Sequence, residues 1–236
     1  MNIETGYILY RGITNGKSFV AIATLESRNV KTGNMVQIWF LLEHTSPIEG
    51  VKSGLDASTI CQDCPFASGN GCYVEVGRAP SMVWKKFKAC GYPELNPCDY
   101  SNVFSGRKIR FGAYGNPTLL PLSIVKAIAT LSDGWTGYFH DWRTNLLAKE
   151  YNKYFMASTE SESSYKLANS LSYRSFHASP VKPDDAIEFA NTRHGTICIE
   201  CKLACNGKTG HNFNIWIDPH GHGKSKAIAA ALSSVN

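Results

Sequence analysis

Residues 108–179 read KIRFGAYGNPTLLPLSIVKAIATLSDGWTGYFHDWRTNLLAKEYNKYFMASTESESSYKLANSLSYRSFHAS, and this stretch decides the fold. Short β-rich runs alternate in it with runs of helical periodicity. Strands are expected at 108–115, 135–141, 155–160 and 173–179, and helices at 120–132, 145–154 and 161–172. Strands separated by helices of this length pair in parallel through right-handed crossovers. The stretch therefore predicts an α/β sheet or barrel.

Further strands and helices are expected on both sides of this stretch. Before it, β-rich runs at 6–12, 18–27 and 35–43 indicate an antiparallel group or the start of a larger sheet. A helix is expected at 79–90, a strand at 212–218 and a last helix at 224–234. A length of 236 residues with 43% hydrophobic content suits a single α/β metal-binding domain over 1–236.

Six cysteines in two tight groups are the most informative residues for function. The early group is Cys61, Cys64 and Cys72, and the late group is Cys198, Cys201 and Cys205. The Cys-x2-Cys spacing lets two thiolates hold one ion or one iron of a cluster, and a third cysteine nearly completes a tetrahedron. We therefore expect all six thiols to be metal ligands, with both groups contributing to one site. His220 and His222 in DPHGHGK (218–224) are further candidate ligands.

A disulfide framework is the main alternative, since eight cysteines in a secreted chain would normally pair. The N-terminal sequence MNIETGYILYRG has no basic region before an apolar stretch, and no segment reaches the roughly 18 apolar residues of a membrane span. A cytoplasmic protein without a membrane partner is expected, and clustered thiols there are more often metal ligands. Cys90 and Cys98 lack a short spacing and are expected to be packed or free thiols, although either could supply a fourth ligand.

Polar residues gather where the expected strands end. In parallel α/β folds the loops after the strands meet at one edge, where ligands bind. We expect a ligand site at that edge made of Tyr114, Asn116, His140, Arg143 and Glu160. His140 could move a proton while Asp141 orients it. A buried aromatic cluster around a hydrogen-bonded histidine explains YFHDWR (138–143) equally well, and the catalytic residues stay open.

Several stretches together resemble a known family. They are KTG (31–33), CPFASGNGCYVEVGRAP (64–80), RFGAYGNP (110–117), YFHDWR (138–143), MASTES (156–161) and CIECKLAC (198–205). The combination is similar to uncharacterised phage and plasmid proteins of the gene-product-88 type, from about Lys31 to His222. The resemblance implies a phage protein of the host cytoplasm, with a partial or complete (β/α) barrel distantly like that of radical S-adenosylmethionine (radical SAM) enzymes. The chain lacks the Cys-x3-Cys-x2-Cys loop of those enzymes.

Two kinds of metal centre suit the thiols. Zinc would accept four thiolates in a closed structural site. An iron-sulfur cluster would use the same thiolates and could transfer electrons or expose one iron. The barrel resemblance favours the cluster, with 4Fe-4S as the preferred form. Six thiols exceed the four that such a cluster needs, so either two are spectators or two sites exist.

Two classes of function follow from these observations. The first is an iron-sulfur protein that works as a redox or cluster-dependent enzyme on a small-molecule ligand at the strand ends. The second is a zinc- or cluster-stabilised nucleic-acid-binding protein, in which Arg143 and exposed aromatics such as Trp142 contact phosphates or bases. A net charge of +5 and a pI of about 8.7 permit an anionic partner, but the basic residues are scattered. The sequence does not indicate the oligomeric state.

Overall fold

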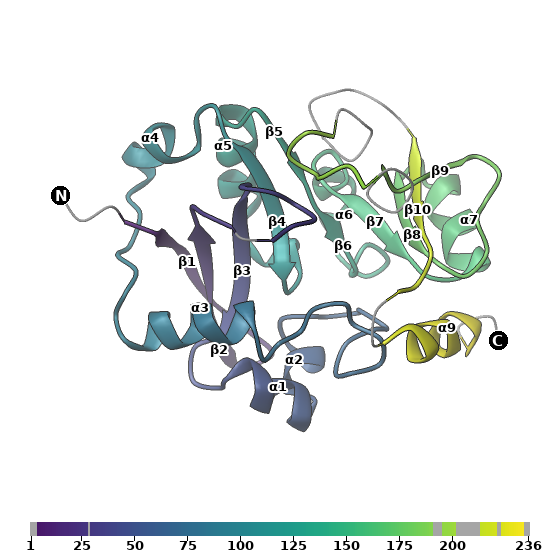
Figure 1. Cartoon of the computed structure of the whole chain (residues 1–236), viewed down its shortest axis with the longest axis horizontal. Helices are drawn as coiled ribbons and strands as arrows, with labels where there is room; N and C mark the ends of the chain where they lie inside the picture. The colour runs from purple at the N-terminus through teal and green to yellow at the C-terminus, as the bar shows by residue number, and fades with distance from the viewer. Residues whose placement is uncertain (1–3, 28, 191–194, 202–212, 221–222, 234–236) are drawn as a thin grey trace.

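The computed structural model describes residues 4–27, 29–190, 195–201, 213–220 and 223–233 of the chain (Figure 1). The described strands form two five-stranded sheets, and helices lie against them. The expected mixed α/β architecture is therefore confirmed. Within these ranges, no helix has both the length and the apolar character needed to cross a membrane.

The first sheet combines antiparallel and parallel strands. In their order across the sheet they are β1 (Gly6–Thr14), β2 (Lys17–Thr24), β3 (Val36–Leu42), β4 (Lys108–Tyr114) and β5 (Gly134–Thr136). β1, β2 and β3 are antiparallel neighbours, whereas β3, β4 and β5 run parallel to one another. The N-terminal β-rich runs are thus the antiparallel start of a larger sheet.

The second sheet is wholly parallel. In their order across it, the strands are β6 (Tyr138–Phe139), β7 (Met156–Thr159), β8 (Ser175–Ala178), β10 (Asn214–Ile217) and β9 (Ala186–Glu188). Only Gly137 separates β5 from β6, and its carbonyl accepts a hydrogen bond of 3.0 Å from the backbone N–H of Met156. The single strand expected at 135–141 is therefore divided between the two sheets.

A closed barrel is not seen among the described strands. β1 and β9 lie at the outer edges of their sheets. The parallel strands from β3 to β8 follow one another in the order that barrel strands have, but the sheets stay open. The prediction of parallel strands is confirmed, and the barrel, partial or complete, is not.

Four helices occur close to where the sequence pattern predicts them. They are α3 (Ala79–Lys88), α5 (Leu122–Leu131), α7 (Glu162–Ser170) and α9 (Lys224–Ser233). The helix expected at 145–154 is reduced to α6 (Ala148–Tyr151). The pattern did not predict β9 or several short elements: α1 (Pro47–Ser53), α2 (Leu55–Ser58), η1 (Pro97–Asp99), α4 (Tyr100–Phe104) and η2 (Pro117–Leu119).

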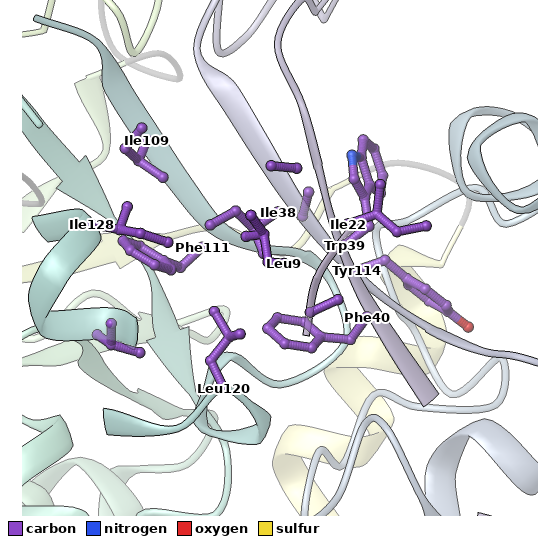
Figure 2. Close-up of a cluster of buried hydrophobic side chains, with 14 of the residues drawn as sticks. Leu9, Ile22, Ile38, Trp39, Phe40, Ile109, Phe111, Tyr114, Leu120 and Ile128 are labelled. Carbon is purple, nitrogen blue, oxygen red and sulfur yellow. The ribbon is translucent and has the colours of Figure 1, made fainter. Parts of the chain in front are cut away.

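Two clusters of buried apolar side chains stabilise the sheets. In the larger one every residue of β3 is buried, and side chains alternate between the two faces of the strands. Figure 2 shows Phe40 and Phe111 on one side of the strands and Trp39 and Tyr114 on the other. The smaller cluster contains Phe66, Met156, Phe176, Ala178, Ile215, Ile217 and Ala227. Because Phe66 lies between two early-group cysteines, this second cluster anchors their loop to the second sheet.

Candidate functional site

The early cysteine group lies at the carboxyl ends of β3 and β4. Its loop follows α2, and the Ile60 carbonyl accepts a hydrogen bond of 2.8 Å from the backbone N–H of Asn116, just past β4. Gly115 permits this approach, because a Cβ there would lie 2.6 Å from the Cβ of Phe40 and 3.3 Å from the Ile60 carbonyl oxygen. The early group therefore lies at the strand-end edge of the first sheet.

The three early thiols lie close enough together to influence one another's ionisation. Cys61 is buried, and Cys64 and Cys72 are half-buried. Burial raises the pKa of Cys61 well above its ordinary value and that of Cys64 to about 12, and it also raises the pKa of Cys72. Negative charge on Cys64 or Cys72 raises the pKa of Cys61 further, and charge on Cys72 raises that of Cys64. The carboxylate of Asp56 raises the pKa of both Cys61 and Cys72. A bound metal would reverse this balance, because a cation favours the thiolate form of its ligands.

Two of these thiols also face backbone N–H groups. The N–H groups of Phe66 and Ala67 at Cys64, and that of Val74 at Cys72, lower the pKa of the respective thiol and partly oppose the effect of burial. A hydrogen bond to the charged form of a group stabilises that form. Hydrogen bonds to ligand sulfurs are also among the features that set the potential of iron-sulfur clusters. At these two cysteines the N–H groups therefore reduce, without reversing, the rise in thiol pKa that burial causes.

No three His, Cys, Asp or Glu side chains within the described ranges lie close enough together to hold one metal ion. Ligands of a single zinc ion converge on one point, with each sulfur about 2.3 Å from the metal. Cluster thiolates bind different iron atoms and lie farther apart.

Asn116 holds the chain on both sides of Cys61. Its backbone N–H binds the carbonyl of Ile60, and its side-chain amide donates to Oε1 of Gln62. The same amide donates to Oδ1 of Asp141 over 2.7 Å. Because a carboxylate can only accept, these bonds fix which way the Asn116 amide points. Its Oδ1 is then a buried acceptor that has no hydrogen-bond partner among the described residues.

Asp141 ties three loops of this edge together. Its carboxylate accepts hydrogen bonds from Asn116 after β4, from Thr118 Oγ1 over 2.9 Å and from Asn145 Nδ2 over 2.6 Å. Thr118 also donates to Gln62 in the cysteine loop, over 3.2 Å. Asp141 therefore positions the loops after β4 and β6 against the loop that carries the early group.

Arg143 and Glu160 form an ion pair beyond the ends of β6 and β7. Arg143 Nη2 lies 3.3 Å from Glu160 Oε1, and Glu160 is only 5% exposed. Burial raises the pKa of Glu160, and Arg143 opposes this shift. Glu160 is near enough to Cys64 to raise the pKa of that thiol. The two residues expected to bind a ligand are thus side by side and adjoin the early group.

His140 completes the polar residues of this edge. Its Nδ1 is buried and makes no hydrogen bond to the part of the chain that the structure describes. Burial lowers the pKa of His140 to about 4; nearby Asp63 opposes this shift and Arg143 adds to it. The ring is therefore neutral near pH 7. His140 is therefore not fully hydrogen-bonded, as it would be in the buried aromatic cluster that was the other interpretation of YFHDWR (138–143).

Tyr114 of the expected ligand site and Trp142 of the nucleic-acid alternative are both buried within the protein. Tyr114 is 3% exposed and donates its hydroxyl to Asp56. Trp142 is 2% exposed, its indole N–H donates to the Ser158 carbonyl over 2.8 Å, and Arg143 covers its ring with the guanidinium carbon 4.0 Å from the centroid. The expectation that Trp142 is an exposed aromatic is wrong, because its ring packs into the main core.

The described residues of the late group lie at the opposite end of the first sheet. The backbone N–H of Cys198 donates to the Lys31 carbonyl over 2.8 Å, and that of Ile199 donates to the Thr32 carbonyl over 3.1 Å. Lys108, the first residue of β4, donates its Nζ to the Ile199 carbonyl. In Figure 1 residues 195–201 lie at the amino ends of β3 and β4, and the early loop lies at their carboxyl ends.

The described thiols of the two groups therefore do not form one shared site. Seven residues of β4 span about 20 Å, which separates Cys198 and Cys201 from the early group. Cys198 and Ile199 instead dock on the turn before β3, at the amino end of that strand. Cys205 and His222 lie outside the described residues. The ring of His220 stacks on Tyr73, with centroids 4.8 Å apart, and its Nε2 lies 2.9 Å from Nζ of Lys31.

The remaining thiols are separate from both groups. None of the seven described cysteines is in a disulfide. Cys90 and Cys98 are exposed, and Cys90 lines a cavity of about 260 Å³ together with Arg11, Phe87, Lys88 and other residues. Both were expected to be free or packed thiols.

Sequence reasoning missed several residues of the strand-end edge. Asp56, Gln62 and Thr118 carry much of its hydrogen bonding, yet none belongs to a recognisable spacing. Gln62 had one available signal, since it lies inside the Cys-x2-Cys segment beside Cys61. Asp56 and Thr118 had none, because their roles depend on how separate loops meet.

Comparisons with known proteins identify no relative of this chain. No protein-family model, no curated protein and no solved structure matches the chain. The resemblance to the phage and plasmid family therefore stays a prediction, and the conclusions about function rest on the geometry of the strand-end edge.

Proposed function

We propose that Cys61, Cys64 and Cys72 bind an iron-sulfur cluster, with 4Fe-4S the preferred form, and that the protein is a redox or cluster-dependent enzyme working at the strand-end edge. The observation that carries the proposal is the convergence of three mutually interacting thiols with the Arg143–Glu160 ion pair at one edge of the parallel strands. Strand carboxyl ends are where parallel α/β folds bind their ligands.

The donor set suits a cluster. Thiolates are the ligands of such clusters, and backbone N–H groups already face the sulfurs of Cys64 and Cys72. Asp56 and Glu160 add negative charge beside the thiols, which a positively charged metal core would offset. Three early thiols leave a fourth cluster position to another donor or to a ligand.

The surrounding side chains have distinct parts in the proposed enzyme. Arg143 supplies a partly exposed cation for an anionic group, with Glu160 holding it in place. His140 is neutral near pH 7 and can accept a proton at a ring nitrogen. Asn116 and Asp141 fix the loop around Cys61. The cluster, when bound, supplies electron transfer or an exposed iron.

The nucleic-acid alternative receives less support. It relied on Trp142 to stack on bases, and that ring is buried beneath Arg143. Sequence-tolerant binding of single strands depends on exposed aromatic faces. Arg143, moreover, is paired with Glu160. We therefore retain the enzyme as the proposed function.

The test is to measure iron, acid-labile sulfide and the visible spectrum of protein purified without oxygen and without a metal-affinity tag. Iron with matching sulfide and broad visible absorption is the expected result. Cys64→Ser and Cys72→Ser should lose most of the iron. Cys98→Ser, at an exposed thiol, and Cys201→Ser, at the opposite end of β4, should keep it. Zinc without sulfide, or equal iron loss in Cys72→Ser and Cys201→Ser, would overturn the proposal.

A further inference from the structure

The described residues of the late group form a compact turn that carries two thiols. The backbone N–H of Cys201 donates to the carbonyls of Ile197, over 3.0 Å, and of Cys198, over 3.2 Å. In such a turn, side chains three residues apart are neighbours, with their Cβ atoms about 5–6 Å apart. In keeping with this geometry, Cys201 is near enough to raise the pKa of Cys198. A disulfide needs Cβ atoms about 4 Å apart, so a small closure of the turn suffices.

Basic side chains surround this turn. Arg110 and Lys31 both act to lower the pKa of Cys198, against the larger effect of burial. Lys108 approaches from β4 and binds the carbonyl of Ile199, between the two cysteines. Reactive cysteines sit in electropositive and partly exposed surroundings, and Cys-x2-Cys pairs are typical of them. Both thiols are half-buried, so a small reagent can reach them.

The turn is also held firmly in place. Its hydrogen bonds to the carbonyls of Lys31 and Thr32 dock it on the chain just before β3. Gly33 provides the space for this docking, since a Cβ there would lie 2.6 Å from the side chain of Ile199. The two thiols are therefore presented on a supported turn, which favours pairing with each other over pairing with a distant cysteine.

We propose that Cys198 and Cys201 form a reversible dithiol–disulfide site, separate from the early group, whose redox partner is a low-molecular-weight disulfide of the glutathione type. In the first step one thiolate attacks the small disulfide, so that a mixed disulfide forms and one small thiolate leaves. The second cysteine thiolate then attacks the mixed disulfide and releases the second small thiolate. The protein loses two electrons and two protons, and the small disulfide becomes two thiols.

The test uses the full chain, treated without oxygen in buffers of oxidised and reduced glutathione, quenched by alkylation and digested with trypsin. Cleavage after Arg193 and Lys202 puts Cys198 and Cys201 in one peptide, 194–202, and Cys205 in the next, 203–208. We expect peptide 194–202 to lose two hydrogens and to escape alkylation under oxidising conditions, and to regain both alkyl groups after reduction.

Two variants sharpen this test. In Cys201→Ser the internal disulfide is lost, and Cys198 should instead hold one glutathione as a mixed disulfide. Cys98→Ser is the matched control, since it removes an exposed thiol and should leave the disulfide of peptide 194–202 unchanged. A link between peptides 194–202 and 203–208, or glutathione on both Cys198 and Cys201 without an internal disulfide, would overturn the inference. So would full alkylation of both under oxidising conditions. These outcomes do not depend on iron, so they are distinguishable from failure of the cluster proposal.

Discussion

Replacing Gly115 by alanine tests whether the early-group loop packs against β3 at this residue. The variant should lose more stability than backbone strain alone would cost. Gly115 has φ of 81°, and a Cβ there would lie 2.6 Å from the Phe40 Cβ, 3.2 Å from the Phe40 carbonyl oxygen and 3.3 Å from the Ile60 carbonyl oxygen. None of these atoms is the end of a flexible side chain. The substitution should therefore push the cysteine loop away from β3.

Gly69 offers a closely matched control. It lies in the cysteine loop with the same φ of 81°, but a Cβ there would meet nothing within 4 Å. Both variants should lose about 1–2 kcal/mol for placing a side chain in left-handed backbone. Only Gly115→Ala should lose a further 1–3 kcal/mol, approximately, from overpacking. We thus expect total losses of about 2–5 kcal/mol for Gly115→Ala and about 1–2 kcal/mol for Gly69→Ala.

Urea unfolding followed by circular dichroism measures this difference, provided that both variants keep the slope of the wild type. For a chain of this size a difference of 1–3 kcal/mol corresponds to about 2–12 °C in melting temperature. Iron retention should fall in Gly115→Ala and hold in Gly69→Ala. Equal stability and equal iron in the two variants would refute the reasoning that the loop packs against β3 at this point.

Three further predictions concern stability. Burial lowers the pKa of His177 to about 4, below its unfolded value of about 6.5, so the unfolded state binds the extra proton. The free energy of unfolding should therefore fall by about 3 kcal/mol from pH 7 to pH 4 through this residue. His177→Gln should show a correspondingly flatter dependence of unfolding free energy on pH, and parallel curves for the two proteins would contradict this. Asn116→Ala leaves Asp141 one donor short and should cost about 1.5–3 kcal/mol in urea unfolding, whereas Asn70→Ala at an exposed site should cost less than 0.5 kcal/mol, approximately. Trp142→Phe removes a buried hydrogen bond and core volume and should lower the free energy of unfolding by about 1–3 kcal/mol in the same assay. Polynucleotide binding should stay unchanged in this variant. Weaker binding would indicate that the Trp142 ring does contact bases.

The strand and helix pattern of the middle of the chain could be predicted because its periodicities are local. β4, β7 and β8 and helices α5 and α7 occur where alternating or helical runs indicate them. The division at Gly137 could not be predicted, since one continuous β-rich run serves two sheets. β9 was also missed, because AIE is a short run without alternation and pairs only through its contact with β10.

The candidate site was predictable in part for a similar reason. Residues just after parallel strands share an edge whatever the details of packing, so Arg143 after β6 pairs with Glu160 after β7, and Asn116 after β4 bonds to Asp141. Cysteine spacing, in contrast, indicates ligand chemistry but not which end of a sheet a loop occupies. The position of Cys198 depends on hydrogen bonds to Lys31, and no local pattern encodes that pairing. Burial of Trp142 likewise depends on long-range packing.

The contacts of Lys31 have a consequence for the order in which the chain can fold during synthesis. Its carbonyl binds Cys198, and its Nζ lies 2.9 Å from Nε2 of His220, which is 189 residues away in sequence. Domains fold from the N-terminal side as they leave the ribosome, and pairings between distant residues form slowly. The early cysteine loop and its partner Asn116 are complete when about half of the chain has emerged. The turn before β3 must wait for nearly the whole chain, and so must the contacts of Phe66 with Ile215, Ile217 and Ala227. Of the contacts that hold the early loop, the nascent protein can therefore close the one between Ile60 and Asn116 first, well before the others.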